Sequence, residues 1–256
     1  MKKTYLFRPI ILLFLIINNS NYAVAQTTAR SVYLTSWQID APIIGMGVAF
    51  PILNKYVWTP RITGLTPAQI QSAQLNIGDI SAFDRPITQN LDLNARKWSD
   101  LTLAAGTLAP TLLFADPDIR RDAPSVATLY AQTFLTNYLL TTVTKQLVQR
   151  PRPFVYNPNA PLAEQEDNDA RFSFFSGHVS TVASMSFFSA KVYSDYHPNS
   201  KATPWIWATA ALLPAATAYL RMHGGKHFPT DVIVGYLVGA TVGILIPELH
   251  RRKSGS

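Results

Sequence analysis

Residues 220–231 carry side chains of the types that do chemistry. An apolar run ends in Arg221, a glycine pair interrupts the chain, and His227 is followed four positions later by Asp231. Histidine serves as a nucleophile or proton carrier near neutral pH, and a carboxylate can orient its ring. These groups stand at the junction of two apolar segments, which favours a site over a packed core.

Two upstream stretches supply complementary groups. Lys145 and Arg152 stand seven positions apart at the end of an apolar segment, and a helical register up to Pro151 would bring both cations toward one face. The run Ser176-Gly177-His178 opens the next apolar segment, and the first turn of a helix has free N–H groups that suit an anion. Together these groups match the needs of a tetrahedral oxyanion such as phosphate.

Three motifs in this order resemble the signature of the type 2 phosphatidic acid phosphatase superfamily, whose relatives include bacterial non-specific acid phosphatases and vanadium haloperoxidases. The resemblance covers about residues 126–247. Phe175 and Leu220 depart from the usual pattern, which has proline and serine there, but neither residue would do chemistry. The motifs are Lys145-x6-Arg152-Pro153, Ser176-Gly177-His178 and Arg221-x5-His227-x3-Asp231.

The resemblance implies phosphomonoester hydrolysis through a phosphohistidine intermediate, with no metal and no cofactor. His227 would be the nucleophile, and Asp231 would hold its other ring nitrogen. His178 would protonate the leaving alkoxide and later activate water. The phosphoryl oxygens would be held by Lys145, Arg152, Ser176, Gly177 and Arg221.

Composition sets the broad class. A chain of 256 residues suits one domain, and the absence of cysteine excludes disulfides and thiolate metal sites. The net charge of +7 gathers partly in the first eight residues and in residues 251–253, at the two ends of the apolar part. Charge placed there is typical of membrane orientation and not of a nucleic-acid partner.

The chain divides into four parts. Residues 1–25 have a basic start, an apolar segment and Ala23-Val24-Ala25 before Gln26, which predicts a secretory signal; an uncleaved anchor helix is the alternative. Residues 26–100 are an N-terminal lead with a possible partial span and a polar connecting region. Residues 101–250 form the catalytic helical domain, and 251–256 are a basic tail.

Apolar segments predict an all-α bundle of five or six helices. They cover residues 101–115, 126–148, 178–193, 204–220 and 231–247, with 41–54 as a doubtful sixth. Thr66 is placed to cap a short helix that continues to Gln74. Gly235, Gly239 and Gly243 recur at four-residue intervals, so they share one helix face and allow a close helix contact.

We expect the bundle to be embedded in the bacterial inner membrane because residues 232–246 are uniformly apolar, although the mean hydropathy is only +0.08. The basic tail would face the cytoplasm, which places the site on the periplasmic side. A cleaved signal would leave the mature N-terminus in the periplasm. We therefore predict that residues 41–54 lie along the membrane or only partly enter it.

Several alternatives stay open at this level. The acidic loop 157–170 is either a solvated face or a gate over the cationic site. His223 either lines the pocket or lies at the surface; metal binding with His227 and Asp231 is disfavoured because glycines and Pro229 interrupt a helix there. The predicted function is a phosphatase with a lipid phosphate as partner. A soluble periplasmic acid phosphatase, a vanadium-dependent haloperoxidase and a non-enzymatic phosphate-binding protein are the alternatives.

Overall fold

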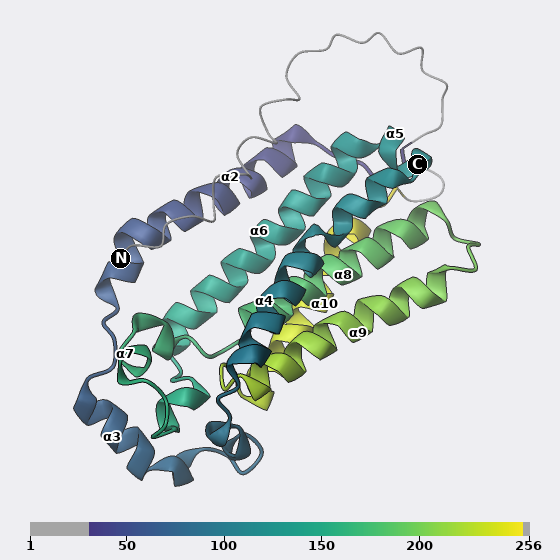
Figure 1. Ribbon diagram of the computed structural model, residues 1–256. Coiled ribbons are helices and arrows are strands. Elements are labelled where there is room, and N and C mark those ends of the chain that lie inside the picture. The colour runs from purple at the N-terminus through teal and green to yellow at the C-terminus, as the bar shows by residue number, and fades with distance from the viewer. Residues whose placement is uncertain (1–30, 253–256) are drawn as a thin grey trace. The chain divides into compact units, whose positions relative to one another are not determined.

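The computed structural model describes residues 31–252, and this part of the chain is helical without a β-strand (Figure 1). The all-α fold class is thus confirmed, while the predicted signal at residues 1–25 lies outside the described residues. Six long helices form the bundle: α2 (Trp37–Leu53), α4 (Leu93–Leu108), α6 (Ala123–Val148), α8 (Gly177–Tyr196), α9 (Thr203–His223) and α10 (Pro229–His250).

Short elements connect the long helices. Three are α-helical, one is a π-helical turn and the rest are 3-10 turns. They are α3 (Pro67–Leu75), α5 (Pro117–Arg121), α7 (Leu162–Gln165), the π turn η1 (Asn54–Trp58), and the 3-10 turns η2 (Thr59–Arg61), η3 (Ile77–Asp79), η4 (Arg85–Gln89), η5 (Ala109–Ala115), η6 (Pro153–Tyr156) and η7 (Asn168–Arg171).

Side-chain caps determine where two helices begin. Thr66 Oγ accepts the N–H of Gln69 at 3.3 Å and the Gln69 side chain accepts the N–H of Thr66 at 3.0 Å, which confirms the predicted cap of α3. Asp92 accepts two N–H groups in the first turn of α4, at 2.8 and 3.1 Å. Helix α4 therefore starts at Leu93, earlier than the apolar run from Leu101 predicts, and the expected boundary at residue 100 falls inside it.

Helix α8 lies among α4, α6, α9 and α10, and its contact with α10 is the closest. The three glycines of α10 face the backbone of α8, which confirms the predicted close helix contact. A Cβ atom built on each glycine would stand 2.2–2.7 Å from a main-chain oxygen of α8 or of its N-cap residue: Gly235 from Ser176, Gly239 from Ser180 and Gly243 from Ser184. Only glycine permits this approach.

Polar side chains link α6 to α8 within the buried interior. Asn137 Nδ2 donates to Thr181 Oγ1 at 3.1 Å, and the hydroxyls of Thr141 and Ser180 lie 3.2 Å apart. These bonds satisfy polar groups that are removed from water, so they fix the register of the two helices.

Helix α2 lies beside α6 and runs in the same direction (Figure 1). Gln132 Nε2 donates to Asp40 Oδ1 at 2.7 Å near the start of α2, and Asn54 meets the Gln146 side chain just after its end. The described chain ends also meet, because the Leu34 N–H donates to the His250 oxygen at 2.8 Å. Helix α2 is therefore packed as part of the bundle, and its place along or only partly within the membrane stays a prediction.

Judged by length and composition alone, α10 is the one helix among the described residues that is long and apolar enough to cross a membrane. Every long helix nevertheless contains a stretch without Asp, Glu, Lys or Arg: residues 41–54, 101–115, 123–144, 179–190, 202–220 and 232–247. Large apolar side chains on several of these helices and on η5 point outward, including Trp37, Leu112, Trp205 and Leu249, each more than 75% exposed.

The end of the bundle that holds the N-termini of α8 and α10 is called the site end below. The connections at residues 54–92 and 149–176 cover it. They share a buried apolar cluster made of Leu65, Ile70, Phe154, Val155, Ala160 and Ala170. This cluster packs the two connections against each other, and it places several of their polar residues over the helix ends.

Candidate active site

His227 lies in the turn between α9 and α10 and is 1% exposed. Its Nδ1 lies 2.7 Å from the main-chain oxygen of Ser173. Because a carbonyl oxygen only accepts, Nδ1 carries the proton and Nε2 keeps its lone pair. Burial and the nearby cations, Arg152 first among them, lower the pKa of His227 well below its usual value. Both effects favour the neutral form of the ring.

Asp231 is placed differently from the sequence-based expectation. Its Oδ2 lies 3.8 Å from His227 Nδ1, beyond hydrogen-bond distance, because the Ser173 carbonyl occupies that position. Asp231 instead accepts the Phe228 N–H at 2.8 Å and the Ser173 hydroxyl at 2.5 Å. Ser173 thus links the two side chains: its hydroxyl donates to Asp231, and its carbonyl contacts the His227 ring.

Arg150 holds Asp231 from the other side. Its Nη1 donates to Asp231 Oδ1 at 2.6 Å, and its Nη2 donates to Asp84 Oδ2 at 2.8 Å. Asp84 is 2% exposed and also accepts the N–H and the hydroxyl of Thr230, at 3.1 and 2.8 Å. The Arg150 group lies over the Phe228 ring, 4.2 Å from its centroid. Sequence reasoning missed both Arg150 and Asp84.

Arg152 reaches His227 from an extended segment and not from a helix. Helix α6 ends at Val148, and Gln149 adopts the left-handed conformation with φ 46°, so the predicted helical register with Lys145 does not continue to Pro151. Arg152 Nη1 lies 3.1 Å from His227 Nε2. The chain reversal after Val148, and not helical periodicity, brings the cation to the histidine.

Lys145 and the start of α8 lie together. A Cβ on Gly177 would approach Thr141 to 3.2 Å and the Lys145 side chain to 3.7 Å, so Gly177 keeps this corner open. Lys145 Nζ donates to the Phe172 oxygen at 2.5 Å. The Ser176 side chain caps α8 by accepting the Val179 N–H at 3.5 Å. The predicted helix start at this position is confirmed, while its binding of an anion stays a prediction.

His178 and Arg221 both contact residues of α4 that the sequence analysis assigned to a connecting region. His178 Nε2 lies 2.8 Å from Asp100 Oδ1. Arg221 Nη1 donates to Ser99 Oγ at 3.1 Å and lies 3.7 Å from Asp100. The Asp92 cap, which starts α4 before residue 100, was the sequence signal that could have indicated this. Arg221 is 5% exposed, and its Nε has no partner among the described residues.

The acidic loop contacts the cations of the site. Arg152 Nη2 donates to Asp169 Oδ1 at 2.7 Å, and Glu164 accepts from Arg96 Nη1 at 2.8 Å and also contacts Lys226. Of the two interpretations of this loop, a solvated face does not describe Glu164, whose side chain is 24% exposed, whereas Asp169 is 56% exposed and still pairs with Arg152. Loss of hydration would raise the pKa of Asp169, but the Arg152 charge and hydrogen bond lower it to about 2.

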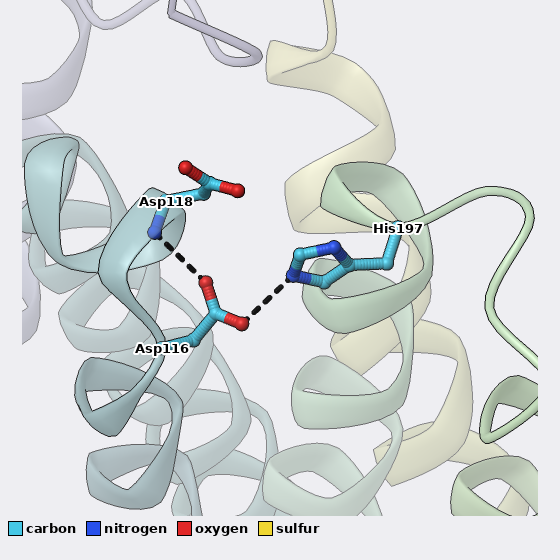
Figure 2. A group of neighbouring side chains, drawn as sticks. All are labelled: Asp116, Asp118 and His197. Carbon is cyan, nitrogen blue, oxygen red and sulfur yellow. Dashed lines mark hydrogen bonds and ion pairs between the residues drawn. The ribbon is translucent and has the colours of Figure 1, made fainter.

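His223 is exposed and stacks on Tyr219, with ring centroids 4.3 Å apart, in agreement with the surface interpretation. A separate group with metal-like spacing lies away from the site: Asp116, Asp118 and His197 (Figure 2). Asp116 Oδ1 caps α5 and Oδ2 lies 2.9 Å from His197 Nε2, so these bonds account for the group without an ion.

A cavity of about 660 Å³ opens at the site end beside α3. Arg150, Asp84, Tyr156 and Phe228 contribute to its lining, together with small and polar residues of α3. Neither proposed catalytic histidine lines it. The cavity therefore borders the residues that hold Asp231 and is distinct from the space between the histidines and the cations.

Comparison with known proteins identifies the family. The chain belongs to the PAP2 superfamily, whose family model matches residues 126–254. A "Lipid A 4'-phosphatase" of Porphyromonas gingivalis is 31% identical over 81 residues, which cover 31% of this chain and 30% of that protein. An "Undecaprenyl-diphosphatase" of Sulfolobus acidocaldarius is 28% identical over 118 residues, which cover 46% of this chain and 52% of that protein.

The chain thus spans about a third and about half of the lengths of these two relatives. Among solved structures, it is similar to a transmembrane PAP2-type phosphatidylglycerolphosphate phosphatase from Bacillus subtilis. That similarity has a TM-score of 0.44 and 21% sequence identity, and covers 81% of this chain and 94% of the other. The resemblance noted from the three motifs is confirmed by the family match.

Proposed function

We propose that this protein is a metal-independent phosphatase that acts through a phosphohistidine intermediate. The observation that supports this most directly is the arrangement of His227: Nδ1 is held by a main-chain carbonyl, and Nε2 faces Arg152. A neutral imidazole with a directed lone pair, next to a cation that can hold phosphoryl oxygens, suits nucleophilic attack on phosphorus.

In the first step His227 Nε2 attacks the phosphorus, an N–P bond forms and the ester P–O bond breaks. His178 supplies a proton to the leaving alkoxide. In the second step His178 takes a proton from water, whose oxygen attacks the phosphorus and releases inorganic phosphate and free His227. Asp100, 2.8 Å from His178 Nε2, would orient that ring in both steps.

The phosphoryl oxygens would be held by buried cations and by the start of α8. Arg221 is buried, and its Nε has no hydrogen-bond partner among the described residues. A bound anion would supply the missing acceptor. Arg152, Lys145 and the Gly177 amide complete the set. Ser176 would contribute mainly by capping α8, because its hydroxyl already accepts an N–H.

The substrate is inferred to be a lipid phosphate or lipid diphosphate in the inner membrane. Two relatives are named for such substrates, and the charge-free helix stretches with outward apolar side chains support a bundle within lipid. The basic Arg251 and Arg252 would keep their end in the cytoplasm, so the site end would face the periplasm.

The test is phosphate release by detergent-purified protein, with a chelator present, from lipid phosphates and a soluble aryl phosphate. We expect chelator-resistant turnover that is lost in His227→Ala, and ³²P retained on wild-type protein after acid-free quenching with labelled substrate. Preference for the aryl phosphate would support a soluble-ester phosphatase instead. Activity that requires vanadate and peroxide, with no phosphate released, would overturn the proposal.

Orientation needs its own experiment. The chain has no cysteine, so single substitutions Leu34→Cys and Arg251→Cys can be labelled from outside intact spheroplasts. The pairing of the two chain ends predicts one compartment for both, and the basic tail predicts the cytoplasm. Labelling of both positions from the periplasm would place the site end on the cytoplasmic side. A signal cleaved before Gln26 predicts that result, because the mature N-terminus would then lie in the periplasm. Opposite compartments would contradict the placement of α2.

A further inference from the structure

A second cationic group lies next to the proposed phosphoryl site and is not used by the mechanism above. Arg96, from α4, and Lys226, from the turn before α10, both contact the same carboxylate oxygen of Glu164. Both also lie over the Phe154 ring, 5.6 Å and 4.6 Å from its centroid. The side chains of the two cations are only 12% and 16% exposed.

This group carries more positive charge than its carboxylate can neutralise. Two cations share Glu164, so one positive charge remains in a poorly hydrated place, where an uncompensated charge is unfavourable. Arg96 Nη2 is buried without a partner among the described residues, and the Lys226 ammonium has Glu164 as its one hydrogen-bond partner there. Burial and the charges of Arg152 and Arg96 lower the pKa of Lys226, as expected in a cationic surrounding.

The group is coupled to the reacting histidine through the chain. Lys226 directly precedes His227, and its main-chain oxygen accepts from Arg152 Nη1 at 3.0 Å. Arg96 Nε donates to the Gly224 oxygen at 2.6 Å in the same turn. An anion bound by these two cations would therefore lie beside a phosphoryl group held by Arg152.

We propose that Arg96 and Lys226 form a second anion subsite, which binds the other phosphate of a diphosphate substrate and which Glu164 occupies when no substrate is present. This rests on the proposed phosphatase function and deepens it. His227 would attack one phosphorus, the bridging P–O bond would break, and the subsite would hold the phosphate that leaves. Glu164 acts as a carboxylate that the second phosphate replaces.

The experiment compares farnesyl diphosphate with farnesyl monophosphate, which differ only in the second phosphate. The measured quantity is kcat/KM for the diphosphate divided by kcat/KM for the monophosphate. In Lys226→Gln we expect this ratio to fall roughly ten-fold or more, since one charge-assisted contact to the second phosphate is lost. Glu164→Gln should raise the ratio, because the competing carboxylate is neutralised. Lys97 is exposed and directly follows Arg96 in the chain. Lys97→Gln removes one positive charge, as Lys226→Gln does, and should leave the ratio unchanged.

The opposite directions of the two variants separate a binding role from simple destabilisation. Methylenediphosphonate, which is not hydrolysed, gives a second readout: we expect Lys226→Gln to weaken its inhibition of monophosphate turnover more than it weakens inhibition by inorganic phosphate. Turnover of both substrates with an unchanged ratio in Lys226→Gln would overturn the subsite while leaving the phosphatase proposal intact. Failure of wild type to turn over either substrate would count against the phosphatase proposal itself.

Discussion

Of the three glycines of α10 that face α8, Gly239 leaves the least room for a methyl group. A Cβ there would stand 2.2 Å from the Ser180 oxygen and 2.9 Å from the Ala183 Cβ. Ordinary contact begins near 3.4 Å, so the two helices would have to separate by about 1 Å. Main-chain atoms of a helix cannot move singly, and the strain therefore spreads along α8 and α10.

The magnitude follows from this separation. Overpacking of this kind typically costs about 1–3 kcal/mol of stability. Helix α8 carries His178 at its start and α10 begins just after His227, so the same shift moves one proposed catalytic group relative to the other. Misplacement of reacting groups by about 1 Å can cost about 100-fold in rate. Gly239→Ala should therefore lower kcat/KM by about that factor.

The assay is thermal unfolding in detergent together with phosphate release from one lipid phosphate. Gly45→Ala is the matched control, because a Cβ at that position of α2 has no atom within 4 Å, and alanine favours a helix. We expect the control to keep wild-type activity and equal or higher stability. A Gly239→Ala protein with an unchanged unfolding temperature and an unchanged rate of phosphate release would refute the close α8–α10 contact described above.

Three further outcomes are expected. Ser173→Ala keeps the carbonyl that orients His227 but removes the hydroxyl donor to Asp231, so kcat/KM should fall roughly ten-fold, less than in Asp231→Asn. Because the pKa of His227 is lowered on folding, the unfolded chain binds one more proton below about pH 6.5, and stability should decline there; in His227→Gln the decline should be shallower by up to about 1.4 kcal/mol per pH unit. Asp169 stays ionised on Arg152 above about pH 2, so Asp169→Asn should bind inorganic phosphate several-fold more tightly at pH 5–8.

Each of these has an outcome that contradicts it. Equal losses in the serine and aspartate variants would show that the Asp231 bonds to the Phe228 N–H and to Arg150 add nothing to the rate. An identical pH dependence of unfolding in wild type and His227→Gln would show that another group titrates. For the loop, Glu166→Gln removes the same charge from an exposed neighbour, and an equal gain in phosphate affinity there would reduce the Asp169 effect to general charge.

Much of the helix content and of the motif could be predicted from the sequence alone. The apolar segments correspond to α6, α8, α9 and α10 within a few residues, because helix period and hydrophobicity are local properties. The Thr66 cap and the glycine face of α10 were also readable, since each depends on residues three or four positions apart. The catalytic candidates rest on such local spacings as well.

The partners of those candidates were decided by the tertiary structure. Asp100 meets His178 and Asp84 meets Arg150 across more than 60 residues of chain, and no periodicity relates such positions. The Ser173 carbonyl displaces Asp231 from His227 because a main-chain group, which sequence does not distinguish, lies closer to the ring.

The path of α2 was likewise a tertiary outcome. Its sequence is apolar but interrupted by Pro42 and Pro51, which left its length in doubt. Its place beside α6 depends on Asp40 meeting Gln132, a contact that exists only once both helices are assembled. Local hydrogen bonds and periodicity determine which segments are helices, whereas the buried polar contacts between segments determine which of them form the site.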